Sequence, residues 1–348
     1  MDLKFYNVKA VPECVIHGRT DLEREDVPLF WNNSGVEVCV DATELWVEVE
    51  VDHSTYEPWY AVEINGSFMI RNMFYAGKHK ICLFRNMTYG VIKRVFFYRE
   101  LQAMWEDNDT HVIVKGFHTD GKFYPVPKYD HRLEFIGDSI SSGEGTYGAR
   151  EDTDWIPMYM SSSRNYINMV GKNLNADVRI ISQGGFGVYS GWDGDLRHDI
   201  PSYYDNICGL ALGDYNKSLG AGKDFDHKTW VPDAVLINLG TNDGTAFLNT
   251  PGIKMAAINK AAYDFLKKIR GYYPASYIIW TYGMAQDVVR EALEGAVDRF
   301  AADTSDKKVS YLALPNCEED EIGSHMHPGP KCHEKAAKVI TDYLKGIL

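Results

Sequence analysis

The chain has 348 residues, of which 45% are apolar and 24% charged, a composition typical of a globular protein with about two domains. Its formal net charge of −13 argues against nucleic acids and anionic membranes as partners. Apolar runs such as residues 234–237 are far shorter than the roughly 20 residues that a membrane span needs.

Residues 1–130 are expected to form an all-β domain. Short strands are predicted throughout, the first three with a clear period of two: 36–41, 45–51, 60–64, 81–83, 95–98 and 111–117. Asn65-Gly66 and Asp120-Gly121 are favoured hairpin turns. Many short strands separated by turns indicate a β-sandwich or jelly roll, and residues 125–131 are interpreted as the link to the next domain.

Residues 131–348 are expected to form a second, α/β domain. Buried strands are predicted at 133–136, 178–181, 234–239, 277–281 and 309–314. Apolar residues at helical spacing lie between and after them, at 166–174, 257–269, 288–300 and 331–344. This alternation predicts a parallel sheet with helices on both faces, whose ligands bind beyond the carboxyl ends of the strands.

The six cysteines are scattered along the chain. Cys39 and Cys82 fall inside apolar strand patterns and are typical of small core residues. The first ten residues lack the basic and then apolar segments of a secretory signal. We therefore expect free thiols and a reducing, cytoplasmic compartment; secretion followed by removal of a signal peptide is the alternative.

A candidate nucleophile follows the strand at 133–136, where the sequence reads Gly137-Asp138-Ser139. A tight turn at the tip of a buried strand exposes the serine hydroxyl, and the following backbone N–H groups can stabilise an oxyanion. For this tripeptide alone, the alternative is an ordinary strand-to-helix turn with a capping residue.

Three further segments occupy comparable positions. A glycine-rich stretch, 182–187, follows one strand, and Asn238-Leu-Gly-Thr-Asn-Asp243 follows another. His327 precedes Pro328 just before the last helix, which keeps the histidine in an extended backbone. Taken singly, these segments are also compatible with a flexible loop, an Asx turn and a surface histidine.

Together the four segments resemble the four-block pattern of the SGNH (GDSL-type) hydrolases. With the β-rich first domain and His17-Gly18-Arg19 near its start, the chain also resembles carbohydrate esterase family 2, whose members are two-domain polysaccharide deacetylases. The resemblance implies an SGNH-type parallel sheet flanked by helices and preceded by a jelly roll. It also implies a serine esterase that acts on an acetylated glycan without a cofactor.

Carried over to this sequence, the family pattern makes Ser139 the nucleophile and His327 the general base and then the acid. The Ser139 N–H, the Gly185 N–H and the Asn242 side chain would form the oxyanion hole. These residue types suit acyl transfer, in which the histidine takes the serine proton and the donors stabilise the tetrahedral intermediate.

The third member of the triad is left open. SGNH hydrolases usually carry Asp three residues before the catalytic histidine, and here that position is Ser324. Candidates are Ser324 itself, Asp320 with its neighbour Glu321, and a backbone carbonyl near Tyr282, since some members of the resembled family use a carbonyl.

Two further patterns could indicate a nucleotide site and a metal site, but we expect neither. Residues 143–148 spell GxGxxG, but they do not lie directly between a strand and a helix with an apolar face. His325, His327, Cys332 and His333 could suggest zinc, but the last two lie in a predicted helix and no CxxC accompanies them.

Aromatic residues crowd the loops around Ser139 and Gly185, and flat rings suit the faces of sugars. The substrate-binding candidates are Trp155, Phe186, Tyr189 and Trp192. Packing of these rings over the sheet is the alternative.

We therefore expect removal of O-acetyl groups from plant polysaccharides or oligosaccharides of the xylan or mannan type, through an acetyl-enzyme. A GDSL-type esterase or thioesterase of lipid-like acyl chains is one alternative, and a carbohydrate-binding protein with weak or lost catalysis is another. The sequence does not indicate the oligomeric state.

Overall fold

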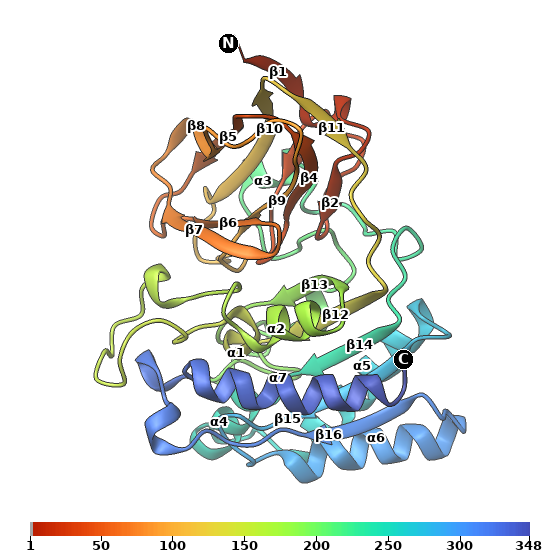
Figure 1. Ribbon diagram of the computed structural model, residues 1–348. Helices are drawn as coiled ribbons and strands as arrows, with labels where there is room; N and C mark the ends of the chain where they lie inside the picture. Colours follow the sequence, from red (N-terminus) through yellow and green to blue (C-terminus); the bar gives the residue numbers. More distant parts are fainter. Residues whose placement is uncertain (1–2) are drawn as a thin grey trace. The chain divides into compact units, whose positions relative to one another are not determined.

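The computed structural model describes residues 3–348, which divide into two compact units (Figure 1). One unit consists of the chain up to Lys128 together with Asn206–Asp224. The other consists of Tyr129–Asp205 and Phe225–Leu348. The first unit therefore contains a segment from within the range 131–348, which the sequence predicts to belong to the second domain.

The first unit is built from two antiparallel sheets. One contains, in spatial order, β1 (Lys4–Asn7), β10 (His111–Thr119), β5 (Leu45–Asp52) and β8 (Gly77–Phe84), with β3 (Val27–Pro28) also paired to β10. The other contains β11 (Lys122–Tyr124), β4 (Gly35–Asp41), β9 (Ile92–Arg99), β6 (Trp59–Ile64) and β7 (Ser67–Met73), with β2 (Val15–His17) paired to β4. Along β5, every second residue from Leu45 to Val51 is buried in the core. The predicted β domain is thereby confirmed.

The segment Asn206–Asp224 is bound to the first unit by hydrogen bonds to loops of that unit. The indole of Trp31 donates to the carbonyl of Ile207 at 2.7 Å. Asn216, within the short helix α3 (Asp214–Ser218), donates to the carbonyls of Asn108 and Thr110 at 3.2 and 3.1 Å. These partners are distant in sequence, so no local pattern could assign the segment to this unit.

The second unit contains a five-stranded parallel sheet. Its spatial order is β13 (Ala176–Ser182), β12 (His131–Gly137), β14 (Ala234–Asn238), β15 (Tyr277–Tyr282) and β16 (Val309–Ala313). In register, Gly137 at the end of β12 pairs with Ser182 of β13 and with Asn238 of β14. The carboxyl ends of these three strands therefore meet at one edge of the sheet.

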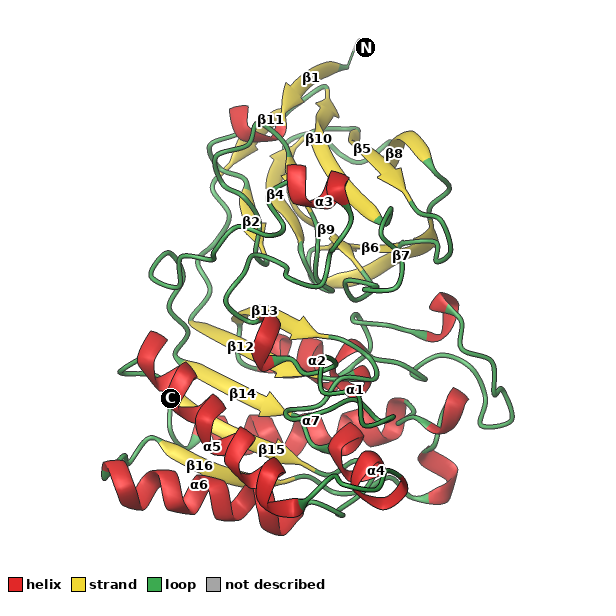
Figure 2. Cartoon of the chain, turned by 180° about the vertical axis from the view of Figure 1, so that it is seen from behind, coloured by secondary structure: helices red, strands yellow, loops and turns green. Residues whose placement is uncertain are grey.

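Helices cover both faces of this sheet. α2 (Tyr166–Asn173) and α7 (Pro330–Lys345) share a core with alternate residues of β12, among them Phe135. On the other face, Glu134 accepts a hydrogen bond from Tyr204, whose ring contacts Phe265 of α5 (Met255–Tyr272). Figure 1 shows α7 in front of the sheet, and Figure 2, from behind, shows α5. This arrangement confirms the predicted fold class.

The remaining helices of the second unit are α1 (Ser139–Ser142), α4 (Thr241–Asn249) and α6 (Arg290–Thr304). Along the whole chain, single 3₁₀ turns occur at Val8–Ala10, Pro157–Tyr159, Pro201–Tyr203, Glu319–Glu321 and Ser324–Met326. Across residues 3–348, no helix combines the length and the apolar character needed to cross a bilayer.

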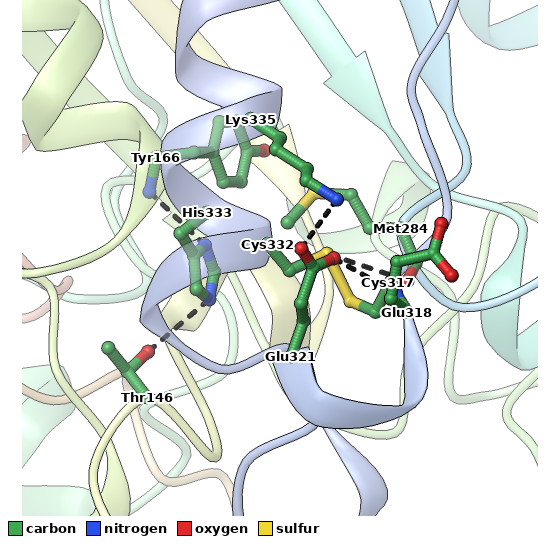
Figure 3. Close-up of a disulfide and its surroundings, with 9 residues drawn as sticks. All are labelled: Thr146, Tyr166, Met284, Cys317, Glu318, Glu321, Cys332, His333 and Lys335. Carbon is green, nitrogen blue, oxygen red and sulfur yellow. Dashed lines mark hydrogen bonds and ion pairs between the residues drawn. A yellow bond between two sulfur atoms is a disulfide. The ribbon is translucent and has the colours of Figure 1, made fainter.

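A disulfide joins Cys317, shortly after β16, to Cys332 in the first turn of α7, with their Cα atoms 5.3 Å apart (Figure 3). The expectation that these two thiols are free is therefore wrong. The sequence could not reveal the pair, because the two cysteines approach each other only through the packing of α7 beside the end of β16. Cys14, Cys39, Cys82 and Cys208 are free thiols.

Candidate active site

Ser139 lies directly beyond the carboxyl end of β12 and begins the short helix α1. The side chain of Asp138 caps this helix by accepting the backbone N–H of Ile140 at 3.0 Å. Gly143 ends it with a left-handed φ of 78°, and its N–H returns to the carbonyl of Ile140 at 3.1 Å. A strand end and a capped single turn thus hold the serine in place.

His327 lies against Ser139. Its Nε2 atom is 2.8 Å from Ser139 Oγ, and its Nδ1 atom is 2.8 Å from the backbone carbonyl oxygen of His325. A carbonyl can only accept, so Nδ1 carries the proton and Nε2 has the free lone pair. The imidazole is therefore held in the tautomer that can take a proton from the serine hydroxyl.

The residues expected to be the third triad member do not contact Nδ1 of His327. Ser324 Oγ donates to the carbonyl of Tyr147 at 3.0 Å. Asp320 pairs with Lys331 at 3.0 Å. Glu321 forms an ion pair with Lys335. A backbone carbonyl does orient His327, but it belongs to His325 and not to the region of Tyr282.

The carbonyl of Tyr282 is engaged elsewhere in the sheet. It accepts the backbone N–H of Leu314 at 2.8 Å, where β15 and β16 end side by side. The carbonyl of Met284 likewise accepts the N–H of Cys317 at 3.0 Å. These two carbonyls therefore hold the segment after β16 to the end of β15.

Glu144 also belongs to the site, although the sequence did not indicate it. This residue is 5% exposed, and its Oε1 atom is 2.7 Å from Nδ1 of His325 and 3.6 Å from Nδ1 of His327. Burial raises the pKa of Glu144, but the charges and hydrogen bonds of His327 and His325 outweigh burial and hold it below its ordinary value. The hydrogen bond to Glu144 raises the pKa of His325.

Glu144 lies between two glycines, and this was the only sequence signal near it. The two glycines belong to the GxGxxG pattern of residues 143–148. In the structure, the backbone of this stretch lies against the segment around His327. Gly145, with a φ of 75°, accepts the N–H of Ser324 at 3.3 Å through its carbonyl. His325 and Met326 also have left-handed backbones, with φ of 51° and 57°.

His333, considered above as a zinc ligand, is fully buried and has partners for both ring nitrogens (Figure 3). Its Nδ1 atom accepts the backbone N–H of Tyr166 at 3.2 Å, and its Nε2 atom is 3.3 Å from Thr146 Oγ1. Burial lowers the pKa of His333 to about 3, so the ring is neutral. We conclude that His333 supports the packing of α7 and does not face a ligand.

Two of the three oxyanion-hole candidates, Gly185 and Asn242, follow the strands on either side of β12. Asn242 is in the first turn of α4 after β14, and its amide donates to the carbonyl of Phe186 at 2.8 Å. Gly185 lies in the loop after β13 with a φ of 82°. The neighbouring Asp243 accepts the N–H groups of residues 188–190, which ties this loop to α4.

The four aromatic candidates have different surroundings. Phe186 is 1% exposed and packs against His198, so its ring offers little surface for stacking on a sugar. Trp192 is 59% exposed beside Gly185 and can contact a ligand. Trp155 is half-buried and donates to Glu144.

Tyr189, also half-buried, lines a cavity of about 330 Å³ together with Lys268 of α5. Neither Ser139 nor His327 lines this cavity. The position of Tyr189 therefore does not connect it with the serine–histidine pair.

Known proteins resemble this chain both in sequence and in fold. The profile described as GDSL-like Lipase/Acylhydrolase matches residues 133–340. The acetyl xylan esterase Est2A from the rumen bacterium Butyrivibrio proteoclasticus is 45% identical, with a TM-score of 0.96 and coverage of 99% of this chain and 98% of that one. A family two carbohydrate esterase from Clostridium thermocellum, solved with cellohexaose, shares the fold at 23% identity and a TM-score of 0.84, covering 96% and 98%.

Among curated proteins, the cellulase/esterase CelE of Acetivibrio thermocellus is 26% identical over 97% of this chain. The match spans only 40% of CelE, which is a longer protein. The resemblance to the SGNH hydrolases is confirmed by the profile, and the resemblance to carbohydrate esterase family 2 by the fold. The profile covers more than half of the chain, which therefore belongs to the GDSL-like lipase/acylhydrolase family.

Proposed function

We propose that this chain is a serine esterase that removes O-acetyl groups from plant polysaccharides or their oligosaccharides, of the xylan or mannan type. The observation that carries this proposal is the 2.8 Å contact between Ser139 Oγ and Nε2 of His327, whose Nδ1 is fixed by a carbonyl. This pair has the geometry of a nucleophile and its general base.

In the proposed reaction, Nε2 of His327 takes the proton of Ser139 while Oγ bonds to the acetyl carbonyl carbon. The bond between that carbon and the sugar oxygen then breaks, and His327 returns the proton to the departing oxygen. Water then gives a proton to Nε2 of His327 and bonds to the acetyl carbonyl carbon. The bond from that carbon to Ser139 Oγ breaks, Oγ takes the proton back from His327, and acetate leaves. No step requires a metal or an organic cofactor.

The oxyanion that forms on the acetyl group needs donors at the same sheet edge. The N–H of Ser139 is at the start of α1, and Gly185 and Asn242 follow the two neighbouring strands. Asn242 uses one amide hydrogen on the carbonyl of Phe186, which fixes its orientation and leaves the second hydrogen for the oxyanion.

The glycan class is supported by relatives and by the surface. Est2A, 45% identical, is described as an acetyl xylan esterase. Trp192 offers an exposed ring next to Gly185, as a sugar-binding surface requires. The loop after β13 is rich in glycine and aspartate, a composition that does not favour the binding of a long acyl chain.

For the compartment, we propose secretion in preference to the cytoplasm. Disulfides persist mainly in oxidising environments, and the Cys317–Cys332 bond supports that alternative. Polymeric plant substrates are also met outside the cell. Cell fractionation of the native host, with the protein detected by antibody, tests this point: recovery in the cytoplasm alone would contradict it.

The function is tested with p-nitrophenyl acetate and octanoate, and then with acetylated xylan, mannan and pectin oligosaccharides. We expect turnover of the acetyl ester, little turnover of the octanoyl ester, and release of acetate from the xylan or mannan oligosaccharides. Ser139→Ala should abolish turnover, since losing such a nucleophile costs on the order of 10⁶ in kcat. Preference for octanoate would favour a lipid esterase, and a tenth of normal activity in Ser139→Ala would exclude the serine mechanism.

A further inference from the structure

The position from which SGNH hydrolases usually supply an acid to their histidine holds Ser324, which is turned toward Tyr147. The carbonyl of His325 replaces the hydrogen bond that such an acid would accept, but a neutral carbonyl cannot replace its charge. During the reaction, His327 becomes an imidazolium, and a nearby negative charge stabilises that state.

A buried carboxylate does lie beside His327, and it comes from the loop after the nucleophile. Glu144 Oε1 is 3.6 Å from Nδ1 of His327, and Glu144 is 5% exposed. The same oxygen is 2.7 Å from Nδ1 of His325, and Trp155 also donates to the carboxylate. At such a distance, in partly buried surroundings, a unit charge matters far more than it does in water.

Glu144 also holds the backbone that presents the carbonyl. His325 has φ 51° and ψ 34°, a left-handed conformation that a non-glycine residue adopts only when its surroundings impose it. Two contacts impose it: the side chain is bonded to Glu144, and the N–H donates to the carbonyl of Asp152 at 2.7 Å. With the side chain anchored on one side, the carbonyl of His325 faces Nδ1 of His327.

We propose that Glu144 is the positioning residue that completes the triad, through its charge beside His327 and through the anchored carbonyl of His325. This inference rests on the proposed function, since it assigns a role within the same site. No proton moves to Glu144: the proton from Ser139 goes to Nε2 of His327 and from there to the departing oxygen, while Nδ1–H remains bonded to the carbonyl of His325. The lowered pKa of Glu144 keeps the carboxylate ionised at neutral pH.

The test uses variants that separate charge from anchoring. Glu144→Gln removes the charge but keeps an oxygen that can accept from His325, and Glu144→Asp keeps the charge on a shorter side chain. His325→Asn removes the anchor with a residue that tolerates the left-handed backbone. Glu151→Gln, at an exposed position of the same loop, is the matched control.

For each variant, kcat and KM are measured with p-nitrophenyl acetate, and folded active sites are counted by titration with a fluorophosphonate. Glu144→Gln should lower kcat per folded site by about 10²–10³-fold, with KM changed less than about threefold, because the charge acts on the imidazolium. The kcat of Glu144→Asp should be about tenfold higher than that of Glu144→Gln. His325→Asn should lower kcat about tenfold or more, and Glu151→Gln should match the wild type.

A Glu144→Gln variant with more than about a third of wild-type kcat per folded site would overturn the proposal. Loss of titratable sites with full kcat in the remainder would also overturn it, because the role would then be only structural. An inactive wild-type protein would instead contradict the proposed function, so the two failures are distinguishable. If Glu144→Gln does not fold, the kcat values of Glu144→Asp and His325→Asn decide instead. A loss of about tenfold or more in His325→Asn supports the proposal, and a wild-type kcat in both variants overturns it.

Discussion

The backbone of Gly145 lies directly against His327: a Cβ atom added to Gly145 would be 2.6 Å from the Cβ of His327. It would also be 2.6 Å from the carbonyl oxygen of Ser324. Both neighbours belong to the segment that presents the imidazole to Ser139. The position of the histidine therefore depends on a glycine in the loop that follows the nucleophile.

Gly145→Ala should therefore lower kcat by about 10²-fold or more, because the added methyl group displaces His327 and the left-handed φ of 75° strains any other residue. The measurement is kcat with p-nitrophenyl acetate, together with a thermal melt. Gly271→Ala in α5, where an added Cβ meets nothing within 4 Å, is the control and should keep full activity. An active Gly145→Ala variant would show that the loop can shift without displacing the imidazole.

Asn242→Ala should lower kcat by about 10²–10³-fold with little change in KM, because an oxyanion donor acts mainly in the transition state. Asn249→Ala, at the exposed end of the same helix, is the matched control. Steady-state kinetics on an acetyl ester separate the two parameters. A change confined to KM would make Asn242 a substrate-binding or structural residue.

Ser324→Ala, Asp320→Asn and Glu321→Gln should each cost less than about tenfold in kcat, or about 1.4 kcal/mol of barrier. The reason is that none of these side chains contacts Nδ1 of His327, which donates to the carbonyl of His325. The three variants are compared with the wild type at the same pH. A loss of several hundredfold in one of them would identify that side chain as the third member.

Chelators should leave activity unchanged, because both ring nitrogens of His327 are already used by Ser139 and His325. The side chains of Glu144, His325 and His327 nevertheless offer ligand atoms within 4.8 Å of one another. Added Zn²⁺ should therefore inhibit by occupying the general base, and EDTA should reverse the inhibition. Activity lost to EDTA alone and restored by zinc would contradict the serine mechanism.

Much of the second unit could be predicted from the sequence because its signals are local. The apolar runs at 133–136 and 234–239 have the length of buried strands, and the expected strands occur as β12 and β14. Ser139 and His327 could be paired in advance through the resemblance to the SGNH hydrolases, whose four blocks fall at recognisable strand and helix ends of this sequence. The structure places their atoms 2.8 Å apart.

Other features depend on contacts that no short pattern contains. The carboxylate of Glu144 is remote in sequence from His325, and only the folded loop brings their side chains together. The ring of Phe186 packs against His198 and Tyr203, which lie further along the same connection after β13, and its glycine-rich flanks did not indicate this. The Cys317–Cys332 bond likewise depends on where α7 packs.

The segment Asn206–Asp224, which belongs to the first unit, means that neither unit is one continuous piece of chain. A fragment beginning at residue 131 would still contain this segment but would lack Trp31, Asn108 and Thr110, which hold it. Its buried apolar side chains would then lack the rest of the unit to which they belong: Ile207, Leu210, Ala211, Leu219 and Ala221. A single cut therefore cannot isolate the catalytic unit. The segment between residues 205 and 225 must also be removed and the two ends joined.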